Sequence, residues 1–270
     1  MNKRTIFIAL LTASILASGI PTTAAAAPIN FTTSIKSSLD KTIAAAESSQ
    51  ADKINSLYDE LLMLQKQSQD LDVEIKALHT RNQETSASLS KEIQQIDADN
   101  LDKLESEVTQ TREQYKALFS HYSSLNKQIE AARMLKNKDL NSMLRFQVNI
   151  LKIPVQLARI NISTKENEWR AAKDLAAKKK KEIRGSLEDI APVNLEIKSK
   201  RSSIKTIETD VTPVWNTFKQ AAKKSEPLSV LDTLASLISL THQINEEKQA
   251  ILNLENKIGD ILSIAKAQMP

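Results

Sequence analysis

Hydrophobic residues recur at alternating three- and four-residue steps through most of this chain. The pattern is clearest in two blocks, from Ile54 to Ile96 and from Leu104 to Leu135, with a shift of register near Asp97. Such spacing puts the apolar side chains on one face of an α-helix, and its repetition over many heptads predicts a coiled coil. No glycine or proline occurs in the 125 residues from Ile29 to Ile153. Because these residues are the usual helix breakers, the helices are expected to be very long.

The composition favours the same fold. Of the 270 residues, 41% are hydrophobic, but only 4% are aromatic and only 3 are glycine. A core built from aliphatic residues with few loops suits helix-on-helix packing, whereas compact domains usually draw on aromatics for buried area. The sequence therefore predicts an all-α protein, an elongated antiparallel helical bundle or coiled coil with very long helices.

The first residues have the pattern of a secretory signal peptide. Lys3 and Arg4 precede an apolar run from Ile6 to Ile20, and four alanines, residues 24–27, supply small side chains for cleavage. We expect residues 1–26 to be this signal peptide, cleaved near Ala25 or Ala26. The mature protein is then secreted, outside the cytoplasm, in the cell envelope or beyond.

The rest of the chain, residues 27–270, is expected to form one elongated helical domain. Breaks in the pattern divide it into an arm (34–138), an apolar turn segment (139–162), a return arm (163–211) and base helices (213–268). Pro154 interrupts the apolar segment, and Ser163 with Glu166 makes a capping box that predicts a helix start. Thr212–Pro213 predicts another helix start, and Ser225–Glu226–Pro227 another break.

The apolar segment from Leu140 to Ile162 is the first candidate site. It also carries Arg145, Lys152 and Arg159 at seven-residue spacing, which gives a helix an apolar body with one basic stripe. Two interpretations stay open: a turn buried against the bundle, or a tip that contacts a membrane or a partner protein. In the second case the contact residues are Phe146, Ile150, Leu151, Ile153 and Val155.

A run of cations is the second candidate site. Lys178, Lys179, Lys180 and Lys181 are followed by Arg184, and the chain carries a formal charge of +4. The run predicts weak contact with an anionic envelope polymer or membrane surface, and a solvated helix face is the alternative. No aromatic side chain alternates with these lysines, so no nucleic-acid partner is expected.

Sequence motifs for bond chemistry are missing. The chain has no cysteine, and its three histidines, His79, His121 and His242, are far apart. Without a histidine or cysteine pair at ligand spacing, a phosphate-binding glycine loop or a nucleophile motif, we expect no catalytic residue, no metal and no cofactor. The chain is therefore predicted not to be an enzyme.

These observations predict an exported, non-enzymatic coiled-coil protein that is a structural, scaffold or adaptor component outside the cytoplasmic membrane. Its partner would be a protein, or a second copy bound through the coiled-coil seams. The alternative is a membrane-active or pore-forming protein that uses residues 140–162. In predicted export, lack of cysteine and long helices, the chain is similar in general build to secreted helical-bundle toxins.

Overall fold

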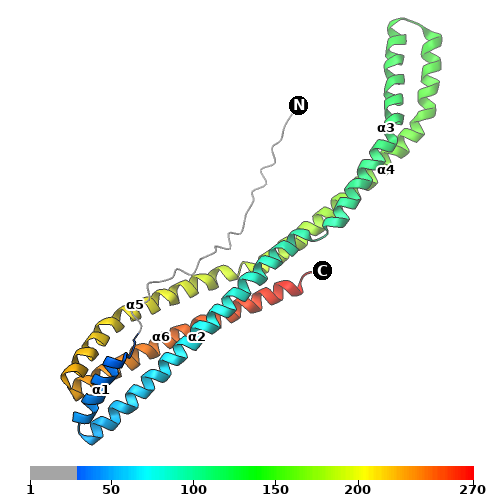
Figure 1. Ribbon diagram of the computed structural model, residues 1–270. Helices are drawn as coiled ribbons and strands as arrows, with labels where there is room; N and C mark the ends of the chain where they lie inside the picture. Colours follow the sequence, from blue (N-terminus) through cyan, green and yellow to red (C-terminus); the bar gives the residue numbers. More distant parts are fainter. Residues whose placement is uncertain (1–28) are drawn as a thin grey trace. The chain divides into compact units, whose positions relative to one another are not determined.

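The structure, a computed structural model, describes residues 29–270, so the predicted signal peptide lies outside the described residues. All regular elements in this part of the chain are helices (Figure 1). The prediction of an all-α protein with very long helices is confirmed, since α2 has 48 residues and α4 has 50. The helices are α1 (Thr33–Ala45), α2 (Ser48–Gln95), α3 (Ala98–Met134), α4 (Lys138–Leu187), α5 (Ile190–Lys224) and α6 (Pro227–Ala267).

The chain divides into two compact units. Unit 1 contains the residues up to Lys76 together with Leu195–Leu254, and unit 2 contains Ala77–Asn194 and Glu255–Pro270. Helices α2, α5 and α6 each contribute residues to both units. The sequence pattern gives no sign of this division, because no helix end lies at the boundaries after Lys76, Asn194 and Leu254.

Unit 1 is packed around aliphatic residues and one aromatic cluster. Phe218 is fully buried and stacks on Trp215, with 5.0 Å between the ring centroids. Phe31 meets both rings and Tyr58 edge-on. Trp215 is 7% exposed and is therefore a core residue. Aliphatic side chains from α1, α2 and α6 complete this core, among them Leu39, Ile54, Leu61, Leu234 and Leu237.

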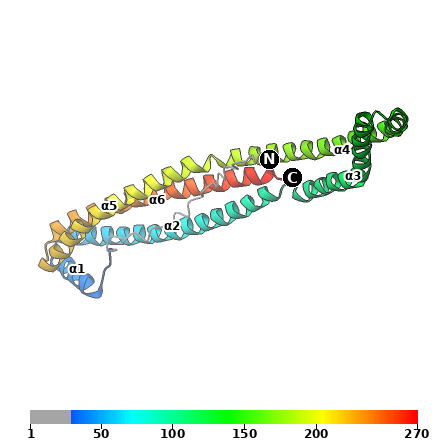
Figure 2. The same ribbon diagram turned by 90° about the horizontal axis from the view of Figure 1, so that it is seen from above.

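Unit 2 contains a hairpin in which α3 and α4 run antiparallel, side by side, in both ribbon views (Figures 1 and 2). The chain reverses within residues 135–137. The amide of Asn137 donates to the carbonyl of Ala132, and that of Lys136 donates to Arg133, which are the two hydrogen bonds of a Schellman turn. Asn137 then caps α4 by accepting from the Leu140 amide.

This turn corrects the predicted boundaries. Residues 139–162, predicted to be the turn segment, belong to α4, and the capping-box pattern at Ser163 lies inside the same helix. Pro154 is also inside α4, and Pro213 is inside α5, where a new helix was predicted. Proline lacks an amide hydrogen, so it removes one helical hydrogen bond but does not have to end the helix when flanking residues pack well. Pro154 leaves the carbonyl of Ile150 without its usual amide partner.

The predicted arm 34–138 consists of three helices, α1, α2 and α3, because the chain also breaks at residues 46–47 and 96–97. The second break coincides with the register shift near Asp97. The predicted return arm 163–211 is divided by a break at residues 188–189, after which it continues in α5. The predicted break at Ser225–Glu226 is confirmed. Three of the turns between helices, including the α3–α4 turn, place a non-glycine residue in the left-handed backbone region. These residues are Asp97 (φ 56°), Lys136 (φ 57°) and Ser225 (φ 55°).

Replacing Lys136 by glycine is expected to stabilise the protein. A side chain in the left-handed region costs about 1–2 kcal/mol, while glycine loses about 0.5–1 kcal/mol more backbone entropy on folding. The Lys136→Gly variant should therefore gain about 0.5–1 kcal/mol, measured by urea denaturation followed by circular dichroism. The matched control is Lys127→Gly, at an exposed position about two turns before the end of α3, which should lose about 1 kcal/mol. A loss in both variants would contradict the assigned turn.

Candidate functional site

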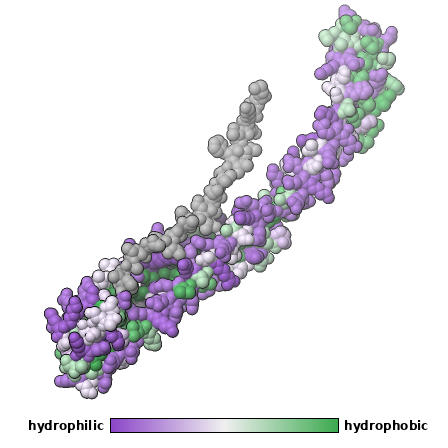
Figure 3. Space-filling view, viewed as in Figure 1, coloured by the Kyte–Doolittle hydropathy of each residue, from purple (hydrophilic) through white to green (hydrophobic). Residues whose placement is uncertain are grey.

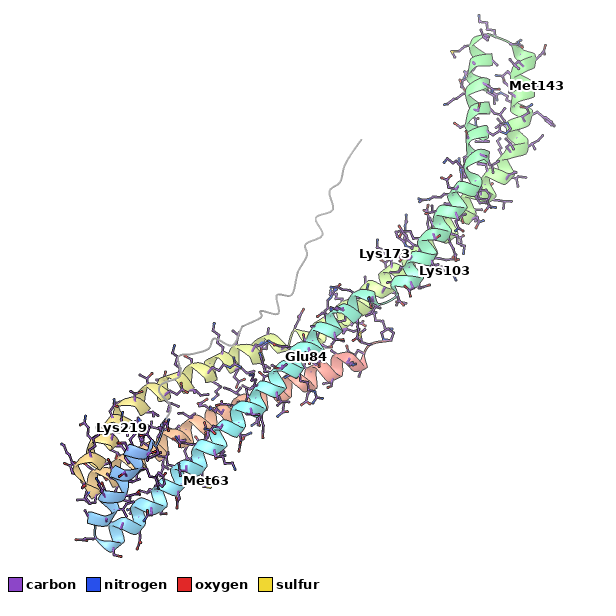
Figure 4. All side chains as sticks on the ribbon, in the orientation of Figure 1. Met63, Glu84, Lys103, Met143, Lys173 and Lys219 are labelled. Carbon is purple, nitrogen blue, oxygen red and sulfur yellow. The ribbon has the colours of Figure 1, made fainter. Side chains whose placement is uncertain are left out.

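The candidate site is an apolar stripe on the outer face of α4, near the hairpin turn. Its members follow the heptad spacing of a coiled-coil seam, yet each is exposed to solvent. Met143, labelled in Figure 4, begins it a few residues after the turn, and hydrophobic residues are visible on this end of the hairpin in Figure 3. We call these residues the outer stripe: Met143, Phe146, Ile150, Ile153, Leu157 and Ile160.

A second stripe with the same spacing holds the hairpin together. On α4 it consists of Leu144, Val148, Leu151, Val155 and Ala158, which we call the inner stripe. Leu144 and Val148 form a buried cluster with Leu125, Ile129 and Ala132 of α3. At 100° per residue the two stripes point roughly 150° apart around the helix axis. The inner stripe has its partner in α3, and the outer stripe has none among residues 29–270.

The structure separates the five predicted contact residues into two groups. Phe146, Ile150 and Ile153 are 65%, 58% and 69% exposed and belong to the outer stripe. Leu151 and Val155 do not: Leu151 packs on the α3–α4 cluster and Val155 is 3% exposed. Their assignment as outward contacts is wrong, because they lie on the helix face that packs on α3. The prediction also missed Met143, Leu157 and Ile160, which share the spacing of Phe146 and Ile153.

The outer stripe is large enough to matter for recognition. Its six residues extend over about 26 Å of helix, at 1.5 Å per residue. At these exposures each side chain presents on the order of 100 Å² of apolar surface, so the stripe presents several hundred Å². Isolated exposed apolar residues are ordinary on a protein surface, whereas a contiguous patch of this size usually marks a contact site.

The same end of the hairpin is strongly basic. Between residues 114 and 165 there are nine lysines and arginines and two carboxylates, Glu130 and Asp139, a net charge of +7, whereas the whole chain carries +4. Within residues 29–270, six of these cations form no ion pair. These six unpaired cations are Lys127, Lys136, Lys138, Arg145, Lys152 and Arg159. From Leu140 to Lys165, α4 contains no carboxylate at all.

Farther from the turn, ion pairs join the two helices and mark the end of the stripe. Lys165 contacts Glu107 of α3 at 3.0 Å and Glu168 at 2.9 Å, and hydrogen bonds to Glu168 and Glu107 raise the pKa of this lysine. Arg112 of α3 pairs with Glu166, and its hydrogen bond lowers the pKa of that carboxyl. The cations in this part of the hairpin are paired with carboxylates, whereas those in the part that carries the outer stripe are mostly unpaired.

The run of lysines predicted to bind an anionic polymer has at least one internal role. The Lys180 Nζ donates to the backbone carbonyl of Gln94 at 2.9 Å, where α2 ends. A cation at this position satisfies an acceptor that the helix leaves unpaired and interacts favourably with the helix dipole. Lys178 lies 4.0 Å from Glu182, and Lys181 and Arg184 are exposed. The structure thus accounts for one of the five cations through its contact with α2.

A buried polar cluster lies elsewhere in unit 2, between α2 and α6. The carboxylate of Glu255 is fully buried and lies 2.8 Å from Nδ1 of His79. Asn82 donates to the Glu255 side chain at 2.9 Å and to its backbone carbonyl at 2.8 Å. Nε2 of His79 is buried without a partner among the described residues. Within residues 29–270 the contacts of this cluster join His79, Asn82 and Glu255, and we read it as one that fixes the register of α2 against α6.

Residues 29–270 show few of the structural features of a catalytic site. A shallow hollow of about 270 Å³ is lined by Glu84, Thr85, Ser88, Leu89, Glu92 and Lys266 and is open to solvent. Within residues 29–270, no three metal-ligating side chains come together. None of the helices in this range has a stretch that is both long enough and apolar enough to cross a membrane.

Comparisons with protein-family models, with characterised proteins and with solved structures find no significant match to this chain.

Proposed function

We propose that this protein is an exported, non-enzymatic interaction protein, a scaffold or adaptor whose working surface is the outer stripe of α4. The single observation that carries the proposal is the pair of heptad stripes on one helix, of which one is satisfied by α3 and the other is exposed. A contiguous apolar face that is exposed to water promotes association, so such a face is best explained by a contact outside the chain.

The packing of the inner stripe on α3 supports the proposal that the outer stripe is a contact surface. Because Leu144 and Val148 already pack on α3, the hairpin does not need the outer stripe for its own stability. A rigid two-helix support also presents the stripe with little loss of conformational freedom on binding.

A second candidate function, the membrane-active protein of the sequence analysis, is favoured by the net charge of +7 over residues 114–165.

The proposal can be tested with single cysteines, since the chain has none of its own. Ile150→Cys places the only thiol in the outer stripe, and Ser56→Cys places it on an exposed position of α2 in unit 1. In the purified protein both thiols should react with a water-soluble maleimide at similar rates. In cells that produce the full chain, the Ile150→Cys thiol should react at least fivefold more slowly than the Ser56→Cys thiol.

The protection should not depend on knowing the partner, because any protein or lipid that covers the stripe shields the thiol. Equal labelling of the two thiols in cells would refute the proposal, since the stripe would then be open to water where the protein works. The Ser56→Cys variant also reports whether the reagent reaches the protein at all.

A further inference from the structure

We infer that the partner of the outer stripe is the surface of a membrane that contains anionic lipids. This inference rests on the proposed function and identifies the chemistry of the surface that the stripe meets. In the proposed arrangement α4 lies along the membrane, with its apolar stripe in the headgroup layer and its cations on the lipid phosphates.

Charge is the first reason. Arg145, Lys152 and Arg159 recur every seven residues and therefore lie along one side of α4, between the inner and outer stripes. They form no ion pair within residues 29–270, and no carboxylate lies on α4 from Leu140 to Lys165. Unpaired cations along a helix match a surface that offers many negative charges without fixed positions, which is what an anionic membrane provides.

The arrangement of apolar side chains is the second reason. The outer stripe contains an aromatic, Phe146, and long aliphatic residues, as in helices that bind the membrane interface. The three cations lie about 130° away around the helix axis, on the flank from which long Lys and Arg side chains can extend back toward a charged surface. The outer stripe ends at Ile160, before Lys165, where ion pairs to α3 begin, and only the isolated Leu175 is a large exposed apolar residue farther along the described part of α4. The part of the hairpin suited to lipid is thus the part next to the turn.

A second copy of the chain is a poorer occupant of the same face. Two stripes packed against each other would bring together two hairpin ends that each carry a net charge of +7 over residues 114–165. Repulsion between like charges would weaken such a contact, because coiled-coil partners normally place opposite charges beside the seam.

The test is co-sedimentation of the purified full chain with lipid vesicles. Vesicles of phosphatidylcholine containing phosphatidylglycerol should bind at least tenfold more protein than vesicles of phosphatidylcholine alone, since each cation near an anionic surface adds about fivefold to binding. Raising the salt concentration should release the protein, because the attraction is screened.

Two triple variants test which residues are responsible. Phe146→Gln/Ile150→Gln/Ile153→Gln removes apolar surface, and its matched control is Met63→Gln/Val73→Gln/Leu228→Gln, at exposed apolar positions in unit 1. Arg145→Gln/Lys152→Gln/Arg159→Gln removes three cations, and its control is Lys53→Gln/Lys66→Gln/Lys76→Gln, at exposed positions of α2 in unit 1. Both hairpin variants should lose at least tenfold in binding, and both controls should stay within about twofold of the parent chain. Circular dichroism should show full helix content in all four, since each position is exposed.

Three outcomes would overturn the inference: no binding to anionic vesicles, equal binding to both kinds of vesicle, or equal losses in a hairpin variant and its control. A chain that ignores vesicles while Ile150→Cys stays protected in cells still has the proposed interaction function, but with a protein partner. If the protection is absent as well, both proposals fail. Concentration-dependent dimerisation through the outer stripe, in place of vesicle binding, would assign the face to a second copy.

Discussion

Replacing His79 by leucine is expected to destabilise the protein by about 3–5 kcal/mol, one of the two largest effects that we predict for a single substitution. The reason is that Glu255 is fully buried and His79 is its only ion-pair partner among the described residues, at 2.8 Å. Without the histidine, the carboxylate keeps only its contact with Asn82. Urea denaturation monitored by circular dichroism at neutral pH would measure the loss.

The double variant His79→Leu/Glu255→Leu separates the buried charge from the loss of packing. Because it removes both ionisable groups, stability should return to within about 1 kcal/mol of the parent chain. Asn82 retains an acceptor there, the backbone carbonyl of residue 255. The matched control is His242→Leu, which removes an exposed histidine 3.7 Å from Glu60 and should cost less than about 0.5 kcal/mol. A double variant as unstable as the single one would show that shape, rather than charge, decides the effect.

Replacing Phe218 by alanine is the second large effect, and a loss of about 3–5 kcal/mol is expected. Phe218 is fully buried in unit 1, where it stacks on Trp215 and meets Phe31 edge-on. Truncation removes the aromatic contacts and leaves a cavity among side chains that can close only partly. Thermal and urea denaturation should both report the loss.

Phe146→Ala is the matched control, because it makes the same chemical change at a residue that is 65% exposed. It should change stability by less than about 0.5 kcal/mol, as expected for a surface position. Comparable losses of stability in the two variants would mean that Phe146 is part of the core. The outer stripe could then no longer be assigned as a contact surface.

The helical class and the length of the helices could be predicted from the sequence, because one apolar stripe per helix leaves a regular three- and four-residue spacing. Residues 140–162 were harder to interpret. They carry two interleaved stripes, so neighbours such as Met143 and Leu144 are both apolar although they face different ways. The segment therefore resembled a uniformly apolar turn, and Leu151 and Val155 were grouped with the wrong face.

The position of the hairpin turn was obscured for a different reason. Turns of this kind are usually recognised from a glycine in the left-handed conformation, and here that position is occupied by Lys136. Pro154, in contrast, is a strong break signal that the helix tolerates. The contact between His79 and Glu255 joins residues 176 positions apart, and spacing along the chain gives no indication of such a pair.

Pro154 also sets a limit on how deeply the hairpin could enter a lipid bilayer. It leaves the carbonyl of Ile150 without an amide partner in the middle of the outer stripe. In the hydrocarbon interior such an orphaned acceptor costs several kcal/mol, whereas at the level of the lipid glycerol it can bind water. Immersion of α4 should therefore stop at a hydrated depth, which favours reversible adhesion over perforation.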